Sequence, residues 1–353
     1  MPRHRSLPRA TKPAFGDGRQ PVSAAADRLA LVALLSGAVG IAFAPIFVRL
    51  SELAPTATAF HRLFLALPVL WLWKHFESRR AAGPGAAPGP DGVVSRTRRD
   101  DIVGLAAAGL LFAGDLAFWH WSIRFTTVAN ATLLANFAPI FVTIAGYLFF
   151  SERFSRQFLL GMALAIAGAA ILMSRSLAFD REHFFGDTLG LVTALFYAGY
   201  ILAVARLRAR LSTVTIMAWS GVVTCIALLT LTLLSGENLV PSSMGGWAVL
   251  FGLALVSHAG GQSLIAFALA RLPPALSSVS LLLQPAIAAL LAWAILAEPL
   301  GPWQGVGALV ILGGIFLARR GSSPSGRDGG GETGQRRRGD VGLRVRLDNK
   351  DVE

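Results

Sequence analysis

Cysteine and charged residues are scarce in this sequence. Its 353 residues include one cysteine, Cys225, and only 15% of them are Asp, Glu, Lys or Arg, against about 25% in soluble domains. A single cysteine excludes an intrachain disulfide and any metal site built from several thiolates. A largely disordered chain is excluded, because such chains are poor in apolar residues. A soluble enzyme with one or two membrane anchors is disfavoured.

The motifs of common enzymes are missing as well. The sequence contains no HExxH, GxSxG, GxxxxGK[ST] or CxxC pattern. These patterns provide zinc ligands, an activated serine, a phosphate-binding loop and a redox-active thiol pair. We therefore expect no catalytic residue, no metal and no cofactor. A pump driven by ATP hydrolysis is also disfavoured.

Apolar residues dominate instead. Residues of the types AVILMFWYC make up 54% of the chain, and the mean hydropathy is +0.58. Ten membrane crossings of about 20 residues each require about 200 apolar positions, which this composition nearly supplies. Apolar runs alternate with short polar breaks, and each run predicts a membrane-spanning helix. The runs are 29–49, 56–73, 102–122, 127–150, 157–174, 188–205, 213–234, 246–269, 275–297 and 301–318.

Three segments lack this pattern. Residues 1–27 are rich in Arg, Pro and Ala, and residues 320–353 are rich in Gly, Ser, Arg and Asp. We expect both segments to be disordered tails. Residues 74–101 contain many Gly, Pro and Arg residues and are expected to form a flexible loop.

The net charge of +12 comes mainly from arginines in the tails and in certain loops. If the N-terminus is cytoplasmic and all ten runs cross the membrane, 27 of the 32 Lys and Arg residues lie on the cytoplasmic side. This asymmetry is typical of membrane proteins, so the basic charge predicts no nucleic-acid partner. We expect a multi-pass protein of the cell membrane, with both termini in the cytoplasm.

The apolar region repeats itself. At an offset of 146 residues the same residue recurs at Pro139 and Pro285, Glu152 and Glu298, Gly161 and Gly307, and Gly168 and Gly314. Five helices within residues 28–174 are thus followed by five similar helices within 175–319. Because each copy crosses the membrane an odd number of times, we expect the copies to be inverted, as in many secondary transporters.

Small residues recur in the last run of each copy. Gly161, Ala165 and Gly168 lie in the run 157–174, and Gly305 and Ala308 lie in the run 301–318. Such residues permit close contact between helices in a membrane.

Several motifs together resemble a known family. They are Pro55-x6-Arg62, Pro139…Ser151-Glu152-Arg153…Gly161…Gly168, and Pro285…Ala297-Glu298-Pro299…Gly307…Gly314. They resemble the EamA domain of the drug/metabolite transporter superfamily, over residues 29–318. The resemblance implies an all-α integral membrane protein of ten helices in two inverted five-helix EamA repeats. It also implies transport of small metabolites by alternating access, and it specifies no substrate.

Ionisable side chains within the apolar runs are candidates for the substrate or proton pathway, since a charge there costs roughly 2.5–3.5 kcal/mol. Asp115 shares a helical face with Trp119 and either binds a cationic group or a proton, or makes a structural hydrogen bond. Arg62 either extends to the interface or neutralises an anionic substrate or Asp115. His258 is a candidate proton carrier, and it lines a cavity with Gln262 or packs helices with it.

Two prolines and two glutamates are candidates for hinges or gates. Pro139 and Pro285 each remove a helix hydrogen bond near the middle of the membrane, which produces either a hinge or free carbonyls for substrate. Asn136 and Gln284 lie next to these breaks and are further pathway candidates. Glu152 and Glu298 end the same two runs.

Three aromatic residues complete the candidate site. Tyr197 and Tyr200 lie in the run 188–205, and Trp219 stands where Arg62 would repeat in the second copy. Rings at these spacings either pack between helices or surround a ligand.

The sequence thus predicts a secondary transporter, and more specifically an exporter, of a small amino-acid-like or drug-like metabolite. Its partners are the small-molecule substrate, the lipid bilayer and a coupled proton or other ion; the oligomeric state is left open. Two alternatives remain open: a membrane-embedded lipid-handling enzyme and a non-transporting membrane subunit.

Overall fold

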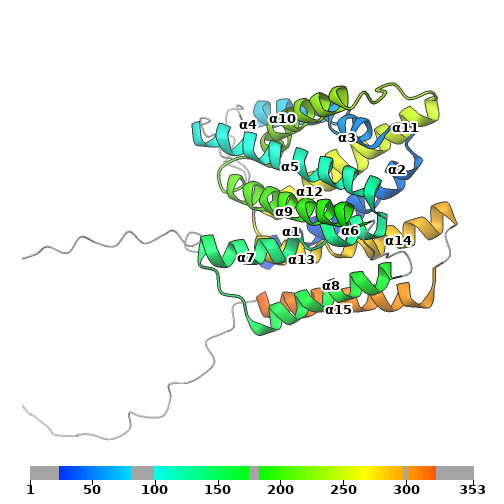
Figure 1. Cartoon of the computed structure of the whole chain (residues 1–353). Coiled ribbons are helices and arrows are strands. Elements are labelled where there is room, and N and C mark those ends of the chain that lie inside the picture. Colours follow the sequence, from blue (N-terminus) through cyan, green and yellow to red (C-terminus); the bar gives the residue numbers. More distant parts are fainter. Residues whose placement is uncertain (1–23, 82–98, 127, 175–182, 298–299, 323–353) are drawn as a thin grey trace, which may run out of the picture. The chain divides into compact units, whose positions relative to one another are not determined.

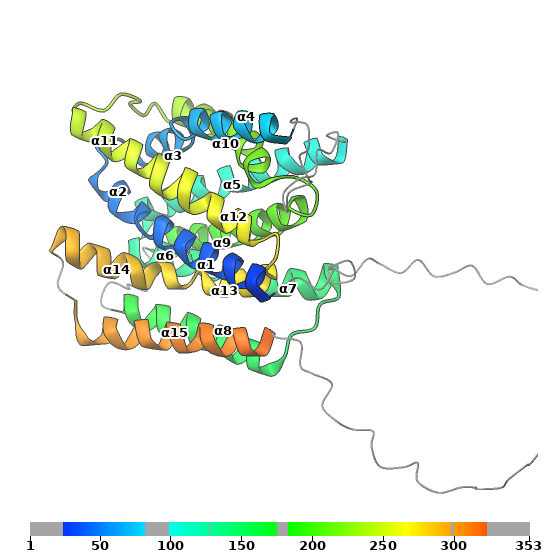
Figure 2. The same ribbon diagram turned by 180° about the vertical axis from the view of Figure 1, so that it is seen from behind.

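Helices form the computed structural model, which describes residues 24–81, 99–126, 128–174, 183–297 and 300–322. No β-strand occurs among these residues. The helices are α1 (Ala24–Ala42), α2 (Ala44–Leu50), α3 (Pro55–Phe64), α4 (Leu67–Ala81), α5 (Arg99–Phe125), α6 (Val128–Ala135), α7 (Ala138–Phe150), α8 (Arg156–Met173), α9 (Phe184–Leu207), α10 (Thr213–Leu234), α11 (Met244–Gly252), the π-helix η1 (Leu253–Gln262), α12 (Ser263–Ala268), α13 (Pro274–Ser280), α14 (Leu283–Leu296) and α15 (Pro302–Ser322) (Figures 1 and 2).

In the described part of the chain these helices form ten stretches that are long and apolar enough to cross a membrane. They are Ala26–Leu50, Pro55–Arg79, Arg99–Phe125, Asn130–Phe150, Arg156–Met173, Phe184–Leu207, Thr213–Leu234, Met244–Ala268, Pro274–Leu296 and Pro302–Ser322. The all-α fold and the ten helices expected from the apolar runs are therefore confirmed, with bounds that differ by a few residues.

The largest difference lies at the predicted loop 74–101. Helix α4 continues to Ala81 and helix α5 begins at Arg99, so both ends of the predicted loop are helical. Charged side chains permit this extension, because their long apolar stems reach the interface while the helix continues. Residues 82–98 lie outside the described residues, as do 1–23 and 323–353 of the two predicted tails.

Large apolar side chains cover much of the bundle's outer surface. Tyr147 is 64% exposed, Phe149 is 71% exposed and Leu309 is 70% exposed. Soluble proteins rarely expose many such residues together, whereas a lipid-facing surface requires them. The distribution of exposed residues therefore fits a protein embedded in a bilayer.

Four of the ten stretches are interrupted close to a proline. The breaks separate α1 from α2, α3 from α4, α6 from α7, and α13 from α14, and the prolines are Pro45, Pro68, Pro139 and Pro285. Proline has no N–H to donate to the carbonyl four residues earlier, so the helical ladder is broken there. The breaks near Pro139 and Pro285 are those that the sequence predicts.

The eighth stretch contains a π-helix that the sequence does not reveal. Residues Leu253–Gln262 form η1 between α11 and α12. Its backbone touches that of α1, because a Cβ added to Gly261 would lie 2.9 Å from the Ile41 nitrogen. The Ser257 hydroxyl also donates to the Gly40 carbonyl at 3.0 Å. Such π-turns are frequently found at functional sites.

Helices α8 and α15, the last helix of each copy, pack side by side (Figures 1 and 2). A Cβ added to Gly161 would lie 2.7 Å from the Gly314 carbonyl oxygen, and one added to Gly168 would lie 2.9 Å from that of Gly307. As the residue number rises along α8 it falls along α15, so the two helices are antiparallel. The predicted small surface at Gly305 is wrong, because a Cβ there would meet open space.

The two copies also end corresponding helices in the same way. Ser151 follows α7 with φ 56°, and its N–H bonds to the Gly146 carbonyl. Ala297 follows α14 with φ 55°, and its N–H bonds to the Ala292 carbonyl. Both pairs are related by the 146-residue offset. The repeat therefore extends to the backbone geometry of a left-handed cap, which non-glycine residues seldom adopt.

Two neighbouring glycines of α15 allow a test of the close contact. We expect Gly314→Ala to lower the free energy of unfolding by about 1–3 kcal/mol, because the new Cβ meets backbone atoms of Ala165 and Gly161 that cannot move aside. Gly313→Ala is the control, since nothing lies within 4 Å of its Cβ, and alanine favours a helix over glycine by about 1 kcal/mol. Thermal unfolding in detergent measures both. Equal melting temperatures for the two variants would contradict the close packing.

Candidate functional site

Arg62 is an arginine buried in the interior of the bundle. It lies in the last turn of α3, before the break near Pro68, and is 8% exposed. Its guanidinium carbon lies 5.9 Å from the centre of the Phe112 ring. Its Nε is buried and has no hydrogen-bond partner in the described residues. Arg62 therefore does not extend to the interface, and part of its donor capacity is unused.

Asp115 of α5 provides the opposite charge. Its carboxylate and the Arg62 guanidinium attract each other. Both residues lie in the described part of the chain, and no ion pair within 4.0 Å joins them. Asp115 is half-buried. The site thus contains a cation and an anion that face a common region without direct contact.

Aromatic rings from both copies stack beside these charges. The Phe112 ring of α5 stacks on the Tyr200 ring of α9, with centroids 4.6 Å apart. Its centroid lies 5.6 Å from that of His258 in η1. The ring of Tyr197, one turn before Tyr200, stacks on the Tyr200 ring, with centroids 6.3 Å apart. Phe112 was missed by the sequence reasoning, although it precedes Asp115 by three residues and so lies on the same face of its helix.

Polar side chains of η1 and α14 complete the arrangement. His258 is 1% exposed, and neither ring nitrogen has a hydrogen-bond partner in the described residues. Gln262 contacts the Tyr200 hydroxyl. Gln284, at the start of α14, contacts the Tyr197 hydroxyl, and its Nε2 is buried without a partner in the described residues.

We refer to these eight residues as the central cluster. They are Arg62, Phe112, Asp115, Tyr197, Tyr200, His258, Gln262 and Gln284. The first three lie in the first copy and the other five in the second, so the cluster exists only where the two copies meet. Seven of the ten pathway residues singled out in the sequence belong to it.

The other three make different contacts. Trp219 is 45% exposed, and its ring packs against Trp71 and beneath the Lys74 ammonium. Its expected place in the pathway stays a prediction, and an aromatic ring beside a lysine is typical of the membrane interface. The Trp119 ring meets His120, with centroids 5.0 Å apart. Asn136 donates from its Nδ2 to the Thr132 carbonyl at 2.9 Å, next to the break after α6.

The hinge and gate roles of the two prolines and two glutamates stay predictions. Pro139 and Pro285 are both buried. The Glu152 N–H donates to the Gly146 carbonyl at 3.0 Å, which closes the end of α7. Glu298 lies outside the described residues.

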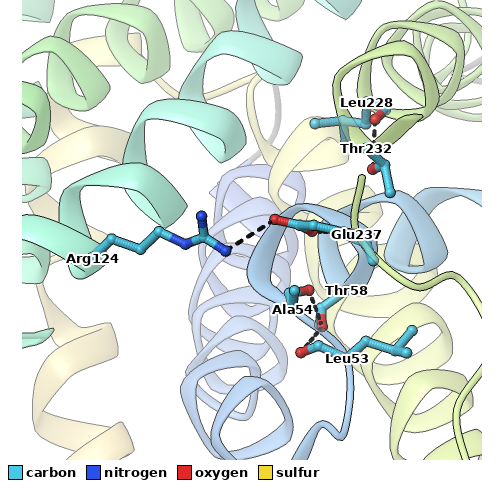
Figure 3. A network of polar contacts seen from close by, with 8 residues as sticks. Leu53, Ala54, Thr58, Arg124, Leu228, Thr232 and Glu237 are labelled. Atoms are coloured by element: carbon cyan, nitrogen blue, oxygen red, sulfur yellow. Dashed lines mark hydrogen bonds and ion pairs between the residues drawn. The ribbon is translucent and has the colours of Figure 1, made fainter. Parts of the chain in front are cut away.

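Polar contacts join the copies at one end of α5, and we refer to them as the first clasp. Figure 3 shows its pair of Arg124 and Glu237. Glu237 accepts from the Ala57 N–H at 2.8 Å and from Arg124 at 3.3 Å. Glu52 accepts from the Ser242 N–H at 2.8 Å and from the hydroxyls of Ser242 and Ser243. The hydrogen bonds from these two serines lower the pKa of Glu52 to about 2.

A second clasp joins the copies at the other end of α5. Arg210 pairs with Asp101 at 3.2 Å, and the Ser212 hydroxyl donates to Glu77 at 2.6 Å. Asp101 and Arg124 are separated by about 35 Å along α5, at 1.5 Å per residue. Asp115 lies between them, about 21 Å from Asp101 and about 14 Å from Arg124. The central cluster therefore lies near the middle of the bundle, between two clasps.

The chain resembles transporters over most of its length. It is 27% identical over 277 residues to an "Uncharacterized transporter" of Archaeoglobus fulgidus, with 77% of this chain and 91% of the other covered. It is 29% identical over 239 residues to a "Probable terminal-alkyne amino-acid exporter" of Streptantibioticus cattleyicolor, with 66% and 78% covered.

A solved structure has the same fold. It superposes with a TM-score of 0.67 over 86% of this chain and 100% of the other, at 18% sequence identity. This likeness shows the fold alone.

The family comparison agrees with the two copies. The model of the EamA-like transporter family matches twice, at residues 27–174 and 184–320. The family indicates a transporter of small molecules in a membrane, and not an enzyme. This chain belongs to the EamA-like transporter family.

Proposed function

We propose that this protein is a secondary transporter that exports a small amino-acid-like or drug-like metabolite, with the central cluster as its substrate site. One observation carries the proposal: a buried Arg62 and a half-buried Asp115 lie midway along the bundle, among residues that both copies contribute. Charged groups in such a position are costly and mark substrate or ion pathways in membrane proteins.

Similarity supports the proposed direction of transport and the proposed substrate class. The relative from Streptantibioticus cattleyicolor is named a probable exporter of an amino acid. Because the sequence contains no ATP-binding loop, the gradient of an ion or of a second solute supplies the energy in this proposal. Asp115 and His258 are the candidate proton carriers, since both lie in the cluster.

The two clasps suggest how access alternates. Each clasp joins the first copy to the second at one end of the bundle, and the substrate site lies between them. In this proposal the copies are inverted, and one clasp opens while the other stays closed. The antiparallel contact of α8 with α15 supports the inversion, because these are equivalent helices of the two copies. A rocking motion around a shared site is the expected result.

The charge distribution supports one orientation. With both termini in the cytoplasm, most arginines lie on the cytoplasmic side of the cell membrane. The first clasp then faces the outside and the second clasp faces the cytoplasm.

Transport itself is tested with purified protein in liposomes. We expect vesicles loaded with an unlabelled solute to accumulate the same labelled solute, for at least one member of a panel of amino acids, amines and cationic drugs. Vesicles without protein are the control. If no solute accumulates while a bilayer lipid is chemically converted, the lipid-handling alternative replaces this proposal. If neither occurs, the protein is the non-transporting subunit.

The first clasp predicts a local loss of protection. Glu237→Ala removes the acceptor of the Ala57 N–H, so we expect this amide to exchange its hydrogen at least tenfold faster. Glu77→Ala is the matched control, because Glu77 belongs to the second clasp and should leave Ala57 unchanged. Both variants should bind substrate within twofold of the wild type while transport slows severalfold. Unchanged exchange at Ala57 in Glu237→Ala would contradict the clasp.

The pKa of Glu52 predicts how the first clasp responds to pH. A carboxylate whose pKa is lowered to about 2 stabilises the clasp fully above its ordinary pKa of about 4.5, and this contribution is lost as the pH falls towards 2. We expect the protection factors of the Ser242 and Ser243 amides to stay constant from pH 8 to pH 5 and to fall below pH 4.5. Glu52→Gln should abolish this dependence. A fall between pH 7 and pH 5 would contradict the assignment.

A further inference from the structure

The two charges of the central cluster, one buried and one half-buried, lack the direct partner that charges inside a protein normally require. Removing a charged group from water costs several kcal/mol, and a buried pair offsets this only when its geometry is good. Arg62 and Asp115 attract each other but form no ion pair within 4.0 Å. Electrostatic attraction at longer range recovers only part of the cost. A ligand that contacts both groups would supply the direct partners that Arg62 and Asp115 lack.

Unused hydrogen-bonding groups lie in the central cluster. The Arg62 Nε, the His258 ring and the Gln284 Nε2 are all buried without hydrogen-bond partners in the described residues. Arg62 and His258 both lie against the Phe112 ring, which holds them in one region. A planar guanidinium binds carboxylates with paired hydrogen bonds. These donors therefore fit a carboxylate.

Asp115 fits the opposite group. Its carboxylate accepts hydrogen bonds and carries the negative charge that an ammonium group requires. The rings of Phe112 and Tyr200 stack on each other in the same cluster, Tyr200 interacts electrostatically with Asp115, and aromatic faces attract cations within about 6 Å. Asp115 lies on the same helix as Phe112, one turn away.

The charges occur in one copy of the repeat only. Arg62 corresponds to Trp219 at the offset of 157 residues, and Trp219 lies beside Lys74 at the bundle surface. The second copy contributes the neutral residues Tyr197, Tyr200, Gln262 and Gln284, together with His258. The site is therefore a single dipole and not a symmetric pair of charges, so a dipolar ligand is held in one orientation.

We propose that the central cluster binds zwitterions, with the carboxylate of the ligand on Arg62 and its ammonium group on Asp115. This rests on the proposed function and narrows it to α-amino acids and compounds that carry the same two charges. Molecules with only one of these charges leave Arg62 or Asp115 unpaired in the bundle, and the site discriminates against them for that reason.

Binding to the purified protein tests this proposal without requiring transport. The twenty proteinogenic amino acids are screened by the thermal stabilisation that each gives in detergent. The member that stabilises most is then compared with its methyl ester, which keeps only the ammonium, and with its N-acetyl derivative, which keeps only the carboxylate. We expect the parent amino acid to bind at least tenfold more tightly than either derivative.

Two conservative variants separate the contributions. Arg62→Gln should weaken binding of the parent at least tenfold and change binding of the methyl ester by less than threefold. Asp115→Asn should weaken the parent by a similar factor and leave the N-acetyl derivative within threefold. Arg206→Gln and Asp100→Asn are matched controls at exposed positions, and they should change nothing.

Three results would overturn the zwitterion site. They are equal affinities for the parent and both derivatives, equal losses for all three ligands in both variants, and no stabilisation by any amino acid. Failure of transport is recognised separately, because it appears as an absence of solute accumulation in liposomes, whatever the binding result.

Discussion

The attraction between Arg62 and Asp115 across the middle of the bundle is the interaction on which the rest of the structure depends. A charge of either sign at this depth is costly, and here two of opposite sign lie near each other without direct contact. The surrounding rings and amides come from helices of both copies. The free-energy cost of the two charges therefore depends on how the helices of the two copies pack around them.

Irregular helices place four residues of the central cluster. Arg62 lies at the end of α3 and Gln284 at the start of α14, each beside a break near a proline. His258 and Gln262 lie in the π-helix η1, whose wider turn changes the direction of side chains relative to an α-helix. Close packing of α8 with α15 is made where glycines remove side-chain bulk. The regular helices α5 and α9 carry the other four residues of the cluster, so the site forms where regular and irregular helices meet.

Much of this could be predicted from the sequence, for a simple reason. Polar residues in apolar runs are rare enough to be conspicuous, so seven residues of the central cluster were singled out from their positions alone. The ten helices followed from the length of the apolar runs, and the repeat followed from matching prolines, glutamates and glycines. The resemblance to the EamA domain rested on the same positions.

Other features could not be predicted, because they depend on which helix faces meet. Phe112 looks like any apolar residue of a lipid-facing helix, and only its contact with Tyr200 reveals its place in the cluster. Trp219 was singled out from the repeat, which fixes its position along the helix but not the environment that its ring enters. The π-helix changes hydrogen bonding without changing composition, so it leaves no pattern in the sequence.

Thiol accessibility from each side of the membrane tests the central claim most directly. In a Cys225→Ser background, Tyr197→Cys places a thiol at the cluster while keeping both charges, and Trp219→Cys places one near the bundle surface. We expect a membrane-impermeant thiol reagent to react at position 197 from either face of the membrane, and at position 219 from one face only. Reaction at position 197 from a single face, or from neither, would contradict a substrate site with alternating access.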